Sequence, residues 1–163
     1  MNPPKTGMRS LLVLAALIIV TEALPSAVQL LNADAWSTWD ASLTKPSWQP
    51  PGWAFGVVWP ILYLFMAVAA WLIWRRSGWN GASGALGLYG VQLVVNALWT
   101  WVYLGLQSLS GSFFWICALW LLIAATMAAF GRHSRAAALL LVPYLAWVTF
   151  AAFLSYTIWR LNA

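Results

Sequence analysis

Side chains that perform acid–base, nucleophilic or metal chemistry are scarce in this chain. Its 163 residues include three acids, Glu22, Asp34 and Asp40, together with one histidine, His133, and one cysteine, Cys117. A structural zinc site takes four Cys, His or carboxylate ligands, and a hydrolytic triad takes a nucleophile, a histidine and an orienting acid. We therefore expect no metal site and no conventional hydrolytic centre.

Glu22 is the only acid that falls deep inside an apolar segment. An ionised carboxylate within a membrane costs several kcal/mol unless it is paired, so Glu22 is expected to have a partner or to hold a proton. A proton or ligand site and a structural bond to a buried amide or hydroxyl both fit, and the sequence leaves both open.

Polar and aromatic side chains share one face of the segment 83–105. At about 100° per residue, Gln92, Asn96, Trp99 and Tyr103 project from the same side of a helix. Amides in hydrocarbon seek partners, so this face is expected to point into a bundle or a cavity. The amides either cross-link helices, at about 0.6 kcal/mol for each bond, or contact a ligand, and the two roles are compatible.

The opposite face of the same segment carries Gly84, Gly87 and Gly90. Small residues allow helices to approach one another closely in a membrane. This glycine face indicates either tight packing within one chain or a homodimer.

Tryptophan is the most unusual component of the chain, with 14 residues. Interfacial anchoring alone would give two similar belts. The distribution is uneven: three lie toward the N-terminal side of the membrane, namely Trp71, Trp74 and Trp79, and nine toward the other, namely Trp36, Trp39, Trp48, Trp53, Trp59, Trp99, Trp101, Trp115 and Trp159. Trp120 and Trp147 fall near mid-depth. Trp147, about 18 Å from Trp159 along a helix, is too deep for an interface. We favour an aromatic cavity on the second side, with a lopsided belt as the alternative.

The elements that position these residues are predicted by composition. Only 7% of the residues are charged and 63% are hydrophobic, whereas soluble domains carry about 25% charged residues. Five apolar segments, each near the roughly 20 residues of a spanning helix, lie at about 8–30, 53–74, 83–105, 112–131 and 136–159. None shows the alternating polarity of a barrel strand. We predict a single all-α membrane domain over 1–163, a bundle of five transmembrane helices.

The longest connection, about 31–52, is called the lid loop below. Loops of this length in a compact bundle are usually disordered or functional, and four large apolar residues argue against disorder. Pro46, Pro50 and Pro51 restrict the backbone toward extended shapes. We therefore expect a stiff lid across one end of the bundle, with Pro60 and Pro143 kinking the helices beneath it.

Basic residues predict the orientation in the membrane. Two lie on the lid side, Lys45 and Arg160, and six on the other, Lys5, Arg9, Arg75, Arg76, Arg132 and Arg135. The excess places the N-terminus in the cytoplasm and the lid loop on the opposite side. This scatter at helix ends does not form a nucleic-acid-binding face. Lys5 and Arg9 before an apolar run also suggest a signal peptide. For cleavage at Ala27, however, Pro25 would occupy the minus-three position of the cleavage site, where a small residue is required.

Three stretches resemble the signature regions of the translocator protein family, whose bacterial members are called TspO or tryptophan-rich sensory protein. They are WDASLTKPSWQPPGWAFGVVWPILY at 39–63, QLVVNALW at 92–99, and VPYLAWVTFAAFLSYTIWRLN at 142–162. The resemblance covers nearly the whole chain, in order and in spacing. It implies five transmembrane helices, frequent dimers, and a pocket closed by the loop between the first two helices.

The resemblance also implies ligands and pocket residues. Family members bind porphyrins such as protoporphyrin IX without a required cofactor, and mammalian members bind cholesterol and isoquinoline carboxamides. Carried over by motif, the ligand-binding residues are Trp48, Trp59, Asn96, Trp99, Trp147 and Leu154, with Trp39 added where the local alignment is looser. Some bacterial members degrade porphyrin in light, which would give Trp59 and Trp147 catalytic roles. The resemblance assigns no role to Glu22.

Leu154, Tyr156 and Arg160 match a proposed cholesterol-binding pattern of weak specificity. The position of Tyr156 and Arg160 at a helix end explains them equally well.

Three functions remain open at this stage. The leading one is a sensory membrane protein that binds a tetrapyrrole or another flat hydrophobic ligand, with Lys45 and Arg160 near its propionates. The alternatives are light-dependent porphyrin breakdown and transport of porphyrins or sterol-like ligands.

Overall fold

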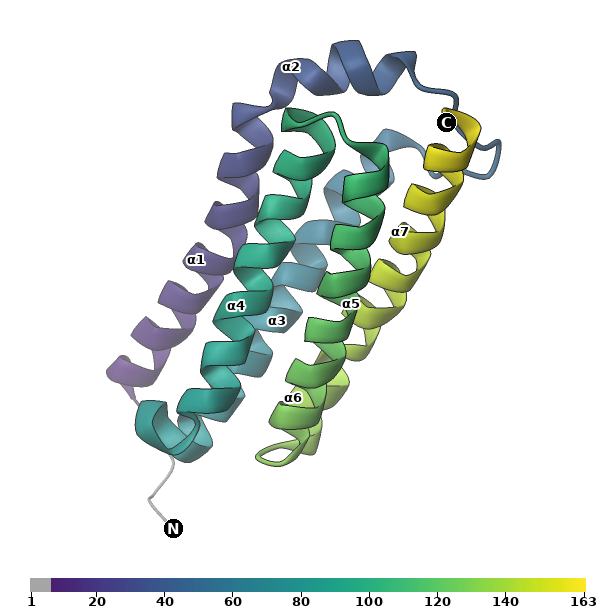
Figure 1. Cartoon of the computed structure of the whole chain (residues 1–163). Helices are drawn as coiled ribbons and strands as arrows, with labels where there is room; N and C mark the ends of the chain where they lie inside the picture. Colours follow the sequence, from purple (N-terminus) through teal and green to yellow (C-terminus); the bar gives the residue numbers. More distant parts are fainter. Residues whose placement is uncertain (1–6) are drawn as a thin grey trace.

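A computed structural model describes residues 7–163, so Lys5 lies outside the described residues. The described part contains five helices long and apolar enough to cross a membrane, as predicted (Figure 1). The first two spans are α1 (Met8–Leu31) and α3 (Gly52–Gly81). The third is α4 (Ser83–Thr100) continued by the π-helical turn η2 (Trp101–Gly105), and the fourth is α5 (Leu109–Gly131). The fifth span ends with α7 (Val142–Leu161). The short helices are α2 (Ala33–Ala35), η1 (Trp36–Asp40) and α6 (Arg135–Leu140), the last of which begins the fifth span.

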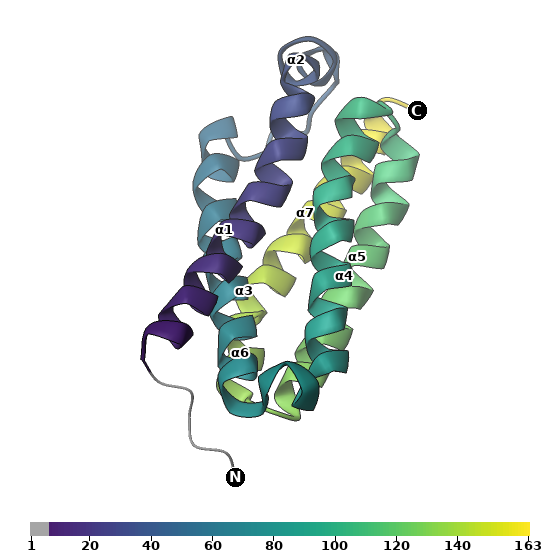
Figure 2. The ribbon, with the colours of Figure 1, turned by 90° about the vertical axis from the view of Figure 1, so that its left-hand side faces the viewer.

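The helices form a closed circuit in which α1 packs on α3 and α4, α4 on α5, and α5 on α7 (Figure 2). The circuit is completed by the fifth span, which α3 contacts mainly through α6 and only slightly through α7. The break between α6 and α7 falls at Leu141, and Pro143 occupies the first turn of α7. Proline is tolerated in a first turn but cannot continue a preceding helix. The fifth span, Arg135–Leu161, is thus interrupted just before Pro143, the residue at which the sequence predicts a kink.

Polar bonds near the start and the middle of α1 hold it against the bundle. The Trp71 indole Nε1 donates to the Ser10 carbonyl over 3.0 Å, joining α1 to α3. The Thr21 hydroxyl pairs with the Tyr89 hydroxyl, joining α1 to α4. Ser10, Thr21 and Pro25 are the buried residues of this helix, and the remainder of it is half-buried or exposed.

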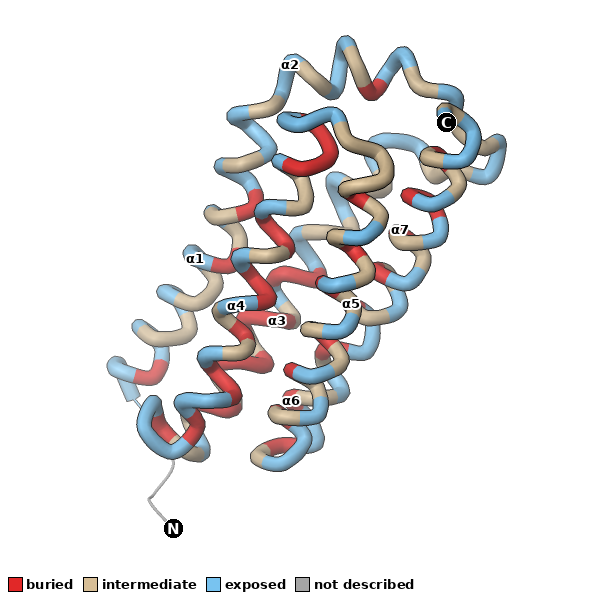
Figure 3. The backbone as a smooth tube through the Cα atoms, in the orientation of Figure 1, coloured by how far each residue is buried: buried red, intermediate tan, exposed pale blue. Residues whose placement is uncertain are grey.

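Side chains with no exposed surface, such as Met66, Trp74 and Phe130, lie mostly toward the end of the bundle away from the lid loop. Buried residues concentrate on the faces that the helices turn toward one another (Figure 3). Trp74 on α3 is the largest fully buried side chain, with no exposed surface, whereas Trp79 is 49% exposed. Trp74 is therefore a core residue, and the interfacial interpretation does not apply to it.

Residues 33–40, at the start of the lid loop, are helical rather than extended (Figure 1). The prolines follow later, and Pro51 is the extended residue immediately before α3. Proline fits just outside a helix N-terminus because the ring pre-sets the backbone and no donor is lost. The extended conformation predicted for the lid loop is thus confined to its second half.

Candidate functional site

A cavity of about 500 Å³ lies beneath the lid loop. All five spans line it, and the lid loop contributes Trp36, Asp40, Lys45 and Gln49. Small-molecule pockets in proteins usually measure about 300–1,000 Å³ and are mostly apolar with a few polar groups. This cavity has the size and the mixed lining of such a pocket.

Two stacked aromatic pairs form its most distinctive walls. Trp59 and Tyr63 on α3 have ring centroids 5.5 Å apart at 30°, and Trp99 and Tyr103 on α4 and η2 have theirs 5.3 Å apart at 5°. Residues four apart on a helix are neighbours on one face, so each pair is set by local sequence spacing. Flat aromatic faces on two helices provide surfaces on which a flat ligand can stack.

A hydrogen-bond network closes the cavity at its deep end. The Tyr63 hydroxyl donates to Asn96 Oδ1 over 3.0 Å, Asn96 Nδ2 donates to the Tyr144 hydroxyl over 2.9 Å, and Tyr144 donates to Gln92 Oε1 over 3.1 Å. The two amides therefore do cross-link α3, α4 and α7, which was one of the roles left open. Asn96 also lines the cavity, so its second role toward a ligand is compatible with this geometry.

Asp40 fastens the helical half of the lid loop. The Tyr103 hydroxyl donates to Asp40 Oδ1 over 2.7 Å, and Lys45 Nζ forms an ion pair with Oδ2 of the same carboxylate. The Trp39 ring packs edge-on against Tyr103, with centroids 5.1 Å apart. The buried carboxylate thus joins the lid loop to the aromatic wall of the cavity.

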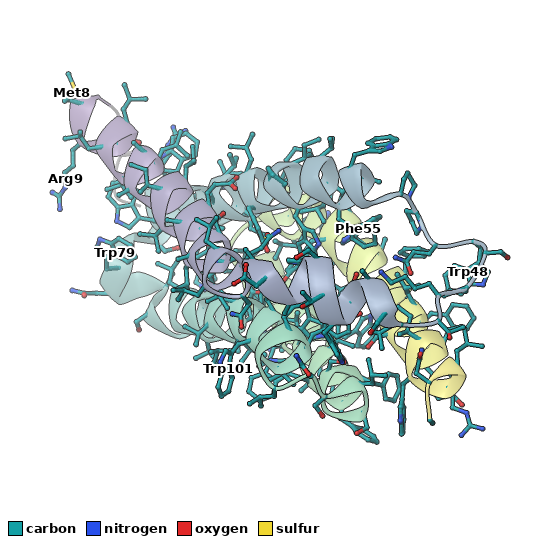
Figure 4. The ribbon with its side chains drawn as sticks, turned by 90° about the horizontal axis from the view of Figure 1, so that it is seen from above. Met8, Arg9, Trp48, Phe55, Trp79 and Trp101 are labelled. Carbon is teal, nitrogen blue, oxygen red and sulfur yellow. The ribbon has the colours of Figure 1, made fainter. Side chains whose placement is uncertain are left out.

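The second half of the lid loop is fastened to α7 and the residue that follows it. The Thr44 N–H donates to Asn162 Oδ1 and Asn162 Nδ2 donates to the Thr44 carbonyl, each over 2.9 Å. Trp48 stacks on Phe153 with centroids 5.4 Å apart. Viewed onto the lid end, Trp48 lies at the rim of the bundle and Trp101 on the outer side of α4 (Figure 4).

The residues carried over by motif fall into two groups. Trp59, Asn96, Trp99 and Leu154 line the cavity. Trp39, Trp48 and Trp147 are not among the lining residues, and each contacts a neighbouring ring instead. Trp147 packs edge-on against Phe55, 5.6 Å away, and Phe55 is the residue that faces the cavity.

The expected crowding of tryptophans around the cavity needs correction. Of the nine on the lid side, only Trp36, Trp59 and Trp99 line it. Trp53 is 72% exposed on the outside of the bundle. The other aromatic residues of the lining are Phe55, Tyr63 and Tyr103. Tyr63 was missed as a site residue, although its spacing of four from Trp59 repeats that of Trp99 and Tyr103.

The sterol pattern does not form one surface. Leu154 is buried and lines the cavity, whereas Tyr156 is 42% exposed and Arg160 is exposed. Positions two apart on a helix point about 200° away from one another, so Leu154 and Tyr156 lie on different faces of α7. Arg160 is not among the lining residues, in contrast to Lys45.

This chain is similar to known proteins over most of its length. Residues 11–160 match the model of the TspO/MBR family. The tryptophan-rich protein TspO of Chlorobaculum tepidum is 43% identical over 123 residues, covering 74% of this chain and 77% of that protein. A tryptophan-rich sensory protein of Cereibacter sphaeroides is 40% identical over 133 residues, covering 82% and 80%. The human translocator protein is 40% identical over 130 residues, covering 76% and 75%.

Proposed function

Since this chain belongs to the TspO/MBR family and is a multi-pass membrane protein, we propose that it binds a tetrapyrrole, protoporphyrin IX, beneath the lid loop in a sensory or regulatory role. The observation that carries this proposal is the pair of stacked aromatic walls around a cavity of about 500 Å³. A tetrapyrrole is a flat apolar macrocycle with polar substituents at one edge. Aromatic stacking and apolar burial would hold its faces.

The polar edge of the ligand has a candidate position at the lid end of the cavity. Lys45 is the cation among the lining residues, and it is held at Asp40. A propionate entering there would share this lysine with Asp40. Arg160 lies outside the lining. Of the two cations that the sequence suggested as partners of the propionates, we therefore propose Lys45 alone.

The orientation of the chain in the membrane is part of the proposal. Arg75 and Arg76 lie near the end of α3, and Arg132 and Arg135 lie where α5 passes into α6. These segments are at the end of the bundle opposite the lid loop (Figure 1). Cytoplasmic loops carry an excess of such residues. We place the N-terminus in the cytoplasm and the lid loop on the opposite side of the membrane.

Trp59→Ala should weaken protoporphyrin IX binding about tenfold, because one of the two stacking walls is lost and each 1.4 kcal/mol changes affinity tenfold. The measurement is quenching of tryptophan fluorescence by protoporphyrin IX, with the protein in lipid nanodiscs and empty nanodiscs subtracted. Trp53→Ala is the matched control, since Trp53 lies on the same helix but is 72% exposed. Equal affinities for the two variants would place the porphyrin elsewhere.

The glycine face of α4 supports a proposed homodimer. A Cβ at Gly84, Gly87 or Gly90 would meet no heavy atom within 4 Å, so this face is open in the single chain. Small residues on an open membrane face permit close approach of a second helix. Gly87→Phe should therefore shift the protein toward monomers in multi-angle light scattering of detergent-solubilised samples. An unchanged dimer fraction, or a wild-type protein that is monomeric in nanodiscs and detergent alike, would rule out this face.

A further inference from the structure

The cavity lining carries two acidic side chains and one basic side chain. Glu22, Asp40 and Lys45 are the charged residues among those that line it. Lys45 is paired with Asp40, and the Tyr103 hydroxyl donates to the same carboxylate. Glu22 is thus left as a carboxylate without a compensating cation in the cavity wall.

Glu22 also has no hydrogen-bond donor in the wall. Across residues 7–163, no donor of the described structure forms a hydrogen bond or ion pair with the Glu22 carboxylate. Tyr63 carries a hydroxyl and lines the same cavity as Glu22. The single proton of that hydroxyl is already donated to Asn96 Oδ1, so Tyr63 cannot serve Glu22 as well.

The placement of Glu22 directs it toward an occupant. Glu22, Pro25, Ser26 and Gln29 line the cavity from one face of α1, at intervals of three and four residues. Glu22 is only half-buried, and the space beside it is the cavity itself. A carboxylate in an apolar site is stabilised most by a charged donor.

We propose that Glu22 is a ligand-contacting residue that makes the cavity select flat apolar molecules carrying a cationic amine. The occupant places its aromatic body against the stacked rings of α3 and α4 and its ammonium or protonated amino group at Glu22. This inference goes beyond tetrapyrrole binding. It uses the same cavity but does not depend on a porphyrin being the physiological ligand.

The test uses a matched pair of flat tricyclic probes, 9-aminoacridine, a cation at neutral pH, and acridine, which is neutral there. Affinities for the full chain in neutral-lipid nanodiscs are measured by probe fluorescence, with empty nanodiscs subtracted. Wild-type protein should bind the cation more tightly than the neutral probe. Glu22→Gln should weaken the cation about tenfold and leave acridine within twofold, because a neutral amide forms a weaker bond than a carboxylate.

Two further variants make the result decisive. Asp34→Asn removes the same charge from the lid side, but Asp34 is exposed and lies outside the cavity lining, so it should leave both affinities unchanged. Glu22→Asp keeps the charge and should retain the preference for the cation, while acridine binding reports that each variant is folded. Equal binding of both probes by wild-type protein, or equal loss of both in Glu22→Gln, would overturn the proposal. A protoporphyrin titration of the same samples separates this result from that of the tetrapyrrole proposal.

Discussion

Gly56→Phe is expected to weaken protoporphyrin IX binding by about a hundredfold. Gly56 lines the cavity on α3, and a Cβ built there meets no heavy atom within 4 Å. The added Cβ is thus accommodated, and we expect the phenylalanine ring beyond it to enter the cavity and take up space that the macrocycle needs. Crowding two groups into a packed site costs about 1–3 kcal/mol, and 2.7 kcal/mol corresponds to a hundredfold loss of affinity.

The fold should survive this change, because replacing glycine within a helix also removes backbone freedom from the unfolded chain. Ala118→Phe is the control, since Ala118 is an exposed position of α5 outside the cavity lining. It should bind porphyrin with wild-type affinity. Undiminished binding by a folded Gly56→Phe protein would mean that the ligand does not occupy this cavity.

Trp74→Ala should give the largest loss of stability among the tryptophan variants. Trp74 has no exposed surface and lies in the core formed by α3 and its neighbours. Truncating a buried tryptophan costs about 3–5 kcal/mol through lost contacts and the hole that remains. The free energy of unfolding, from denaturant titrations in mixed micelles, measures the effect.

Trp79→Ala provides the comparison at the same end of the bundle. Trp79 is 49% exposed and contacts Trp74 at a centroid separation of 6.2 Å. Its removal should cost less than about 1 kcal/mol, as for most surface positions. If both variants lost the same stability, Trp74 would be acting as an interfacial anchor and the assignment of the core would be wrong.

Hydropathy predicted the five spans because the membrane requires each of them to be long, apolar and helical. The ends were harder to predict. The second segment was expected to end at residue 74, before Arg75 and Arg76, yet α3 continues as a regular helix past both arginines and breaks only at Gly78, where φ is 70°, before its last residues to Gly81. Arg75 lies over the Trp71 ring, 4.5 Å from its centroid. Side chains that reach along the helix in this way allow charged residues to remain helical at the membrane edge.

Helix periodicity also predicted part of the site. Gln92, Asn96 and Tyr103 are buried, with Trp99 half-buried beside them, as expected for a face turned inward. The path of the lid loop was not predictable in the same way. It depends on Tyr103 bonding to Asp40 and on Asn162 bonding to Thr44, residues 63 and 118 positions apart in the chain. These distant contacts decide that Trp36 lines the cavity while Trp48 stacks outside it.

An experimental structure of the protein with protoporphyrin IX bound in lipid tests the site most directly. The macrocycle should lie beneath the lid loop, with Trp59 and Tyr63 on one side, Trp99 and Tyr103 on another, and its propionates toward Lys45. A macrocycle bound on the outer surface, for example in the groove lined by Val28, Leu98 and Trp101, with the inner cavity unoccupied, would contradict it.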